Sequence, residues 1–185
     1  AYMDTTDVYN NKSAARYIIE LLKQLKIDSA YFLGASSGGT ITLEIATMAP
    51  ELVKKMVVVG AQIYYSQQTR KWVQERGELQ PDTDEVSLHG IQKANLLEKQ
   101  FYHYRNLYGE LSLTPDILNL IKAKTLIVNG DNDQAVPFKE NALQMYNSIS
   151  NSHLWIVPNG GHLPHLDNMN HADFLRRVLE FYSLR

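Results

Sequence analysis

Residues 32–39 read Phe-Leu-Gly-Ala-Ser-Ser-Gly-Gly, so Ser36 has a glycine two positions before it and another two positions after it. The run 30–33 is short and apolar, which is typical of a buried strand. The run 41–49 is nearly all apolar and ends at a proline, which is typical of a buried helix. This stretch therefore predicts a sharp strand-to-helix turn with a serine at its tip. Alone, the pattern is also compatible with a Ser/Gly-rich turn that binds a phosphate.

Strands and helices alternate along most of the chain. Further buried strands are predicted at 55–59, 125–128 and 153–157, and apolar residues recur at helical spacing in 14–25, 142–149 and 174–182. Ser13 and Thr114 are the predicted N-caps of two helices, and Pro115 would occupy the first turn of the second. The alternation predicts the α/β class, with a mostly parallel sheet and helices on both of its faces.

The stretch 62–113 interrupts this alternation. It is polar and rich in aromatic residues, which predicts a helical cap insertion over one end of the sheet. The core would then comprise residues 1–61 and 114–185. Four aromatic side chains of the insertion are candidates for lining an acyl or alcohol pocket, although packing within the cap explains them equally well: Tyr64, Tyr65, Phe101 and Tyr102.

Two further segments with reactive side chains also follow predicted buried strands. One contains Asp131 and Asp133, and the other contains His162. Open α/β sheets place their sites at the carboxyl ends of the strands, where these residues and Ser36 would meet. A serine hydroxyl needs a base such as imidazole to take its proton, and the imidazole needs a carboxylate to orient it. The sequence thus predicts a Ser–His–Asp arrangement with two candidate acids.

Several classes of protein are not favoured by the composition. The chain is 44% hydrophobic and 21% charged with a formal net charge of −2, which indicates one globular domain. It has no stripe of Lys and Arg that could follow a nucleic acid, and no apolar run long enough for a membrane span. The first residues lack a signal-peptide pattern, and a cytoplasmic location is only the default expectation.

Metal and thiol chemistry are not expected either. The chain contains no cysteine, so it can form neither a disulfide nor a thiolate site. His165 and His171 lie close to His162 in the sequence, but no carboxylates cluster with them at metal-ligand spacing. We expect surface or packing roles for both, and no metal or cofactor.

Three segments resemble the nucleophile, acid and histidine segments of α/β-hydrolases: Phe32–Gly39, Leu126–Asp133 and Gly160–Pro164. The resemblance covers most of the chain outside the insertion. It implies hydrolysis of a small carboxylic ester, or a related acyl compound, through an acyl-enzyme. Ser36 would be the nucleophile and His162 the base, and the Ser37 backbone N–H would stabilise the oxyanion. In that family the acid usually lies three residues after the glycine that ends its strand, which selects Asp133 over Asp131.

Other activities of the same fold stay open. Because chemistry in this fold depends on the pocket and the loops, aminopeptidase, carbon–carbon bond hydrolase and cofactor-free perhydrolase activities are alternatives. Serine at the turn argues against the dehalogenases and epoxide hydrolases, which use aspartate there. A hydrolase-like module that binds a ligand or partner without catalysis is the alternative from a different class.

The chain also departs from the family pattern. Only four strands are predicted, and both the first half of the sheet and the loop that supplies a second oxyanion N–H are missing from the pattern. Loss of one oxyanion donor lowers turnover by about 10² to 10³, so we expect weak catalysis by this chain. Either the chain is a fragment of a longer protein, which we favour, or a second chain supplies the missing strands; the nucleophile strand of this chain would then have an exposed edge. That edge would favour self-association.

Overall fold

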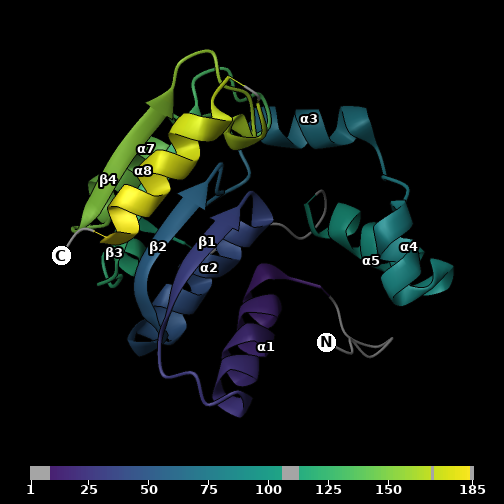
Figure 1. The fold of residues 1–185 in the computed structure, drawn as a ribbon. Helices are drawn as coiled ribbons and strands as arrows, with labels where there is room; N and C mark the ends of the chain where they lie inside the picture. The colour runs from purple at the N-terminus through teal and green to yellow at the C-terminus, as the bar shows by residue number, and fades with distance from the viewer. Residues whose placement is uncertain (1–8, 106–112, 168, 184–185) are drawn as a thin grey trace.

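A four-stranded parallel sheet forms the centre of the protein in a computed structural model, which describes residues 9–105, 113–167 and 169–183 (Figure 1). The strands lie in the order in which they occur in the chain, and each pairs in parallel with the next. Their bounds are β1 (Ala30–Ala35), β2 (Val53–Val59), β3 (Lys124–Gly130) and β4 (Ser152–Val157). The four predicted strands and the parallel sheet are confirmed.

Helices cover both faces of the sheet, as the alternation predicted. One face packs against α1 (Asn11–Gln24), α2 (Ser37–Met48), the short α6 (Pro115–Leu118) and α7 (Ala142–Ser148), and the other packs against α8 (His171–Ser183). Alternate residues of β2 point to opposite faces, as a strand requires. Met56 and Val58 belong to the core under α2, whereas Val57 and Val59 belong to the core under α8.

The ends of two helices test the predicted caps. Asn10, not Ser13, is the N-cap of α1, because its side-chain oxygen accepts the backbone N–H of Ser13 at 2.7 Å. The prediction was wrong because both residue types cap helices well, and only the backbone geometry distinguishes them. Thr114 does precede α6, and Pro115 is its first residue. Single 3₁₀ turns lie at Pro50–Leu52 and Pro164–Leu166.

The predicted insertion is largely helical in the residues that the structure describes. It contains α3 (Gln67–Arg76), α4 (Thr83–His89) and α5 (Ile91–His103), while 106–112 lie outside the described residues. Figure 1 shows α3 near the carboxyl ends of the strands, and α4 with α5 to one side of the sheet. The division into a core and a cap stays a prediction.

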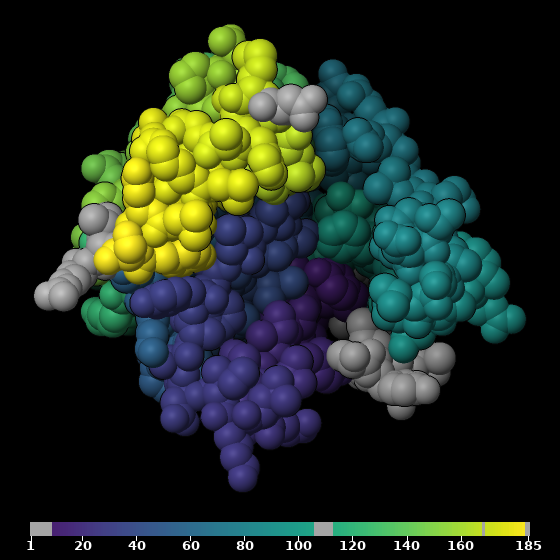
Figure 2. Space-filling model, in the orientation of Figure 1, coloured from purple at the N-terminus to yellow at the C-terminus, as the bar shows by residue number. Residues whose placement is uncertain are grey.

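Strand β1 has a strand neighbour on one side only among the described residues. Tyr31 and Leu33 are 53% and 50% exposed, so the prediction of a buried strand at 30–33 is wrong for one of its faces. The Tyr182 ring of α8 stacks on Tyr31, and the Tyr182 hydroxyl donates to the carbonyl of Phe32 at 2.7 Å. Helix α8 nevertheless leaves part of the strand uncovered. Figure 2 shows this surface between α8 and α1.

We propose that the chain self-associates through this edge, because unpaired strand edges beside apolar side chains tend to pair with other chains. Residues 1–185 alone should elute as an oligomer or aggregate in size-exclusion chromatography with light scattering. Leu33→Lys should reduce association, whereas Leu88→Lys, at a 78% exposed position on α4, should not. Elution of the unmodified chain as a 21.1 kDa monomer would contradict the proposal.

Candidate active site

Ser36 lies at the tip of a sharp turn between β1 and α2. Its backbone has φ 51° and ψ −123°, a conformation that costs energy for any residue other than glycine. The turn is tight because Gly34 lies against Gly38, and a Cβ at Gly34 would collide with the Gly38 carbonyl. The Ser36 N–H donates to the Val59 carbonyl at 2.7 Å, which ties the turn to the next strand. The predicted strand-to-helix turn is therefore present.

His162 lies between Ser36 and Asp133. Its Nε2 is 2.9 Å from Ser36 Oγ, and its Nδ1 is 2.9 Å from Asp133 Oδ2. With an ionised Asp133, the network assigns the ring proton to Nδ1, and Nε2 is then free to accept the serine hydroxyl. The Asp133 carboxylate is buried, whereas the imidazole is 23% exposed. The structure thus brings together the three residues that the sequence singled out.

The alternative acid, Asp131, does not take part in this arrangement. It is exposed, whereas Asp133 is buried and held by further donors. Asp133 Oδ1 accepts the backbone N–H groups of Ala135 and Val136 at 2.9 and 2.8 Å. These bonds fix the carboxylate with its second oxygen directed at the imidazole.

Glycines allow the loops after the strands to approach one another. Gly130 ends β3 and lies against the backbone of Gly160, so that the two loops with Asp133 and His162 meet. Gly60 follows β2 with φ +56°, and a Cβ there would lie 2.8 Å from the His162 carbonyl and 3.1 Å from its Nδ1. The sequence reasoning missed Gly60. The available signal was a glycine at the end of a buried apolar run, as at Gly34 and Gly130.

The Ser37 backbone N–H is the predicted oxyanion donor. Ser37 is the first residue of α2, where backbone N–H groups have no carbonyl partner within the helix. The positive end of the helix dipole lies at the same place. The position suits an oxyanion next to Ser36, and the assignment stays a proposal.

Helix α3 lies next to the imidazole. The Trp72 ring centroid is 6.3 Å from that of His162, and the Arg76 guanidinium lies 4.7 Å from the Trp72 ring. The Gln68 side-chain amide donates to the Gln134 carbonyl at 3.3 Å, which connects α3 to the loop with Asp133. The sequence reasoning did not select Trp72 as a site residue. Its signal was the single aromatic side chain of a mostly polar helix.

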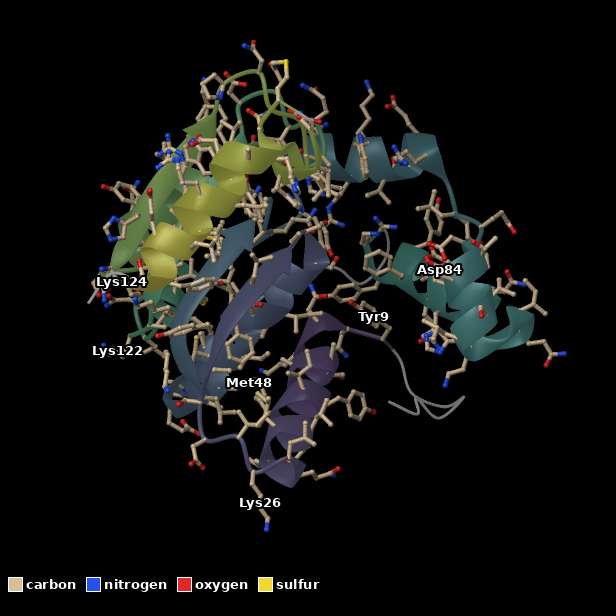
Figure 3. All side chains as sticks on the ribbon, in the orientation of Figure 1. Tyr9, Lys26, Met48, Asp84, Lys122 and Lys124 are labelled. Carbon is tan, nitrogen blue, oxygen red and sulfur yellow. The ribbon has the colours of Figure 1, made fainter. Side chains whose placement is uncertain are left out.

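Tyr65 and Phe101, two predicted pocket residues, belong to an aromatic cluster at the start of α1. The Tyr9 ring lies 5.4 Å from Phe101 and 5.8 Å from Tyr104, which in turn is 6.2 Å from Tyr65. Figure 3 labels Tyr9 at this place between α1 and α5. Burial is the main reason that the pKa of Tyr9 is raised to about 12. Packing accounts for these contacts, and a pocket role stays a prediction.

The other two predicted pocket residues lie elsewhere. Tyr64 packs partly against the core under α2, and burial together with the nearby Glu140 carboxylate raises the pKa of its hydroxyl. The Tyr102 ring contacts that of His103 at 6.1 Å. Among the described ring contacts, Trp72 is the aromatic residue that meets His162.

Metal ligands do not cluster in the described part of the chain, where no group of three or more His, Asp or Glu side chains could hold an ion. His165 packs against Phe174 with ring centroids 5.0 Å apart, and its carbonyl lies 3.0 Å from His171 Nδ1. Burial, helped by the nearby His171 and His162, lowers the pKa of His165. Within 9–105, 113–167 and 169–183, no helix is both long and apolar enough to cross a bilayer.

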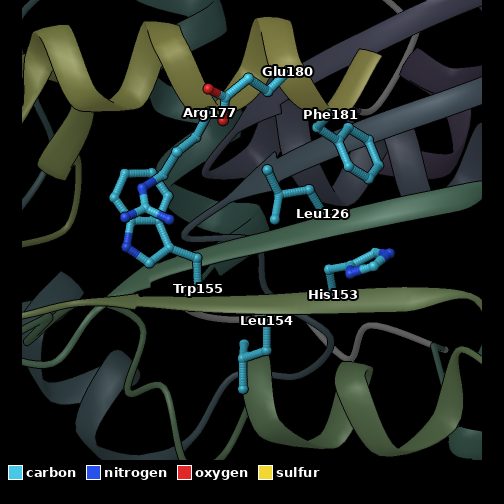
Figure 4. A pocket seen from close by; sticks show the side chains of 7 residues that line it. All are labelled: Leu126, His153, Leu154, Trp155, Arg177, Glu180 and Phe181. Atoms are coloured by element: carbon cyan, nitrogen blue, oxygen red, sulfur yellow. The ribbon is translucent and has the colours of Figure 1, made fainter. Parts of the chain in front are cut away.

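A groove of about 240 Å³ lies between β4 and α8 (Figure 4). Trp155, Arg177 and Phe181 are among the residues that line it. Arg177 already pairs with Asp173 at 2.7 Å, and its guanidinium lies 4.7 Å from the Trp155 ring. None of the groove residues is a predicted catalytic residue, so it is separate from the Ser36 site.

Comparison with known proteins points to one family. A family model described as the alpha/beta hydrolase fold matches residues 2–86. RutD of Serratia proteamaculans, named as a carbamate hydrolase, is 27% identical over 189 residues, which cover 89% of this chain and 70% of RutD. The mouse serine hydrolase BPHL is 26% identical over 174 residues, which cover 90% of this chain and 58% of BPHL.

Solved structures show the same fold. The meta-cleavage product hydrolase CumD of Pseudomonas fluorescens IP01 superposes with a TM-score of 0.74 at 20% identity, covering 98% of this chain and 75% of CumD. An alpha/beta hydrolase from a deep-sea metagenome library, MGS-M2, gives a TM-score of 0.75 at 19% identity, covering 97% of this chain and 74% of MGS-M2. At these identities the similarity concerns the fold alone.

Proposed function

Because the chain belongs to the α/β-hydrolase family, we propose that it is a serine hydrolase that cleaves a small carboxylic ester or a related acyl compound. The observation that carries this proposal is the position of His162, whose two ring nitrogens lie 2.9 Å from Ser36 Oγ and from Asp133 Oδ2. A carbamate, which the name of RutD indicates for that protein, is a related acyl compound and suits the same chemistry.

The proposed reaction has two half-reactions. Ser36 Oγ attacks the carbonyl carbon while His162 Nε2 takes the hydroxyl proton, and Asp133 stabilises the imidazolium that forms. The Ser37 N–H donates to the oxyanion. When the tetrahedral intermediate collapses, His162 returns the proton to the leaving alcohol, and an acyl-enzyme remains. A water molecule then repeats the sequence and releases the acid, which regenerates Ser36 without any cofactor.

The location of Trp72 indicates where the substrate would bind. The Trp72 ring, on the proposed cap, lies beside the His162 imidazole, and that imidazole is only 23% exposed. A substrate carbonyl within reach of Ser36 Oγ would therefore lie close to α3. We propose that Trp72 forms a wall of the acyl or alcohol pocket and limits the access of water to the base.

A non-catalytic binding module is the alternative, and the hydrogen bond on Ser36 argues against it. A pocket that only binds a ligand needs neither a serine in a strained conformation nor a base aligned with its hydroxyl. Aminopeptidase and carbon–carbon bond hydrolase activities use the same three residues, and a substrate screen would distinguish them from ester hydrolysis.

Labelling with a fluorophosphonate tests whether Ser36 is activated. We expect the reagent to modify the folded protein at Ser36, because only a serine whose proton is removed reacts readily. Peptide mass spectrometry should place the adduct in 34–39, and His162→Ala should remove it. An unlabelled protein with native circular dichroism would instead support the binding module.

A further inference from the structure

We propose that Asn129 is a positioning residue that holds the Asp133 carboxylate toward His162, an inference that rests on the proposed serine hydrolase activity. Asn129 is the residue before the glycine that ends β3, and it is fully buried. Its side-chain amide nitrogen lies 3.4 Å from Asp133 Oδ2, the oxygen that meets His162 Nδ1. That carboxylate oxygen therefore faces a second donor besides the imidazole.

The amide also fixes the loop that carries the carboxylate. Asn129 Nδ2 lies 3.1 Å from the carbonyl oxygens of Gly130 and Val136, so it joins the two ends of the loop with Asp133. The N–H of Val136 is one of the two backbone donors to Asp133 Oδ1. Asn129 thus acts on one carboxylate oxygen directly and on the other through the loop. Because 3.4 Å is long for a hydrogen bond to a carboxylate, we expect the direct contribution to be modest.

The other end of the Asn129 side chain has no partner. Its Oδ1 is buried without a hydrogen bond, whereas Nδ2 faces three acceptor oxygens. These acceptors identify which end of the amide is the nitrogen. A buried oxygen without a donor lowers stability, and an apolar side chain of similar size would avoid that cost. The amide therefore fits a role toward Asp133 better than a role in folding.

Asn129→Leu removes the donor and keeps the approximate volume. We expect kcat for an activated ester, and the rate of fluorophosphonate labelling, to fall about tenfold while KM changes little, because the lost group acts on the base and not on the substrate. Asn141→Leu is the matched control: Asn141 is equally buried after the same strand, but it accepts from the Ile63 N–H and has no described bond to Asp133. It should leave kcat nearly unchanged when both proteins are folded.

A double-mutant cycle separates positioning from a general loss of structure. In the Asp133→Asn background the Asn129 amide would face another amide nitrogen. Asn129→Leu should therefore lower kcat by less than about twofold in that background. Equal losses in the two backgrounds, or an equal loss with Asn141→Leu, would overturn the proposal. If leucine prevents folding, Asn129→Ala is used in the same cycle.

Failure of this inference can be told from failure of the proposed function. If Ser36→Ala abolishes hydrolysis but Asn129→Leu does not lower kcat, only the role of Asn129 is wrong. If Ser36→Ala retains activity, the function itself is wrong. The proton NMR signal of His162 Nδ1–H still reports on Asn129 in that case, since Asn129→Leu should shift it and Asn141→Leu should not.

Discussion

Ser36→Ala is expected to reduce hydrolysis of para-nitrophenyl acetate to the uncatalysed background and to abolish the acyl-enzyme seen by intact-protein mass spectrometry. Removal of a triad serine lowers turnover by on the order of 10⁶ where the rest of the site is intact. In this chain the hydroxyl lost is the one that His162 Nε2 meets at 2.9 Å. No neighbouring hydroxyl has a described bond to that nitrogen.

Ser37→Ala is the control for this result. Ser37 adjoins Ser36 in the sequence but is the first residue of α2, and its predicted contribution is a backbone N–H that alanine retains. Most of the activity should therefore remain. The reverse order of effects would mean that the strand-to-helix turn presents a different nucleophile from the one proposed.

The sheet and its reactive edge could be predicted because their signals are local. The buried runs of β2 and β3, the helix after Ser36 and the glycines at the strand ends each follow from a few adjacent residues. Parallel strands bring their carboxyl ends to one edge, so Ser36, Asp133 and His162 could be predicted to lie at the same edge of the sheet. The choice between the two aspartates required family resemblance, because both follow the same strand.

Contacts between distant segments could not be predicted in the same way. Trp72 meets His162 across 90 residues of chain, and although Trp72 is the only aromatic residue of α3, the sequence of that helix does not identify His162 as its partner. The exposure of β1 to solvent depends on which elements lie beside it in space, and these cannot be inferred from the strand itself. Its apolar composition alone predicts burial. The Ser13 cap was wrong for a related reason, since the first turn of α1 begins wherever the backbone leaves the extended conformation.

Asp133→Asn is expected to lower kcat by on the order of 10⁴ with little change in folding, because the amide favours the wrong imidazole tautomer. The local geometry explains why. Oδ1 accepts two backbone N–H groups, so an amide oxygen is retained at that position and the amide nitrogen is turned toward His162. It then donates to Nδ1, which leaves the ring proton on Nε2. A protonated Nε2 facing Ser36 Oγ cannot accept the serine proton.

Asp131→Asn provides the comparison for this prediction. Asp131 is exposed and has no described bond to the imidazole, so the variant should keep kcat within about twofold of the unmodified protein. Steady-state kinetics on para-nitrophenyl acetate, with thermal unfolding of each variant measured in parallel, would compare the two directly. Equal losses would mean that neither carboxylate selects the tautomer and that the loop acts through its charge. A large loss with Asp133→Asn alone, at unchanged unfolding temperature, is the result that the hydrogen bond from His162 Nδ1 to Asp133 requires.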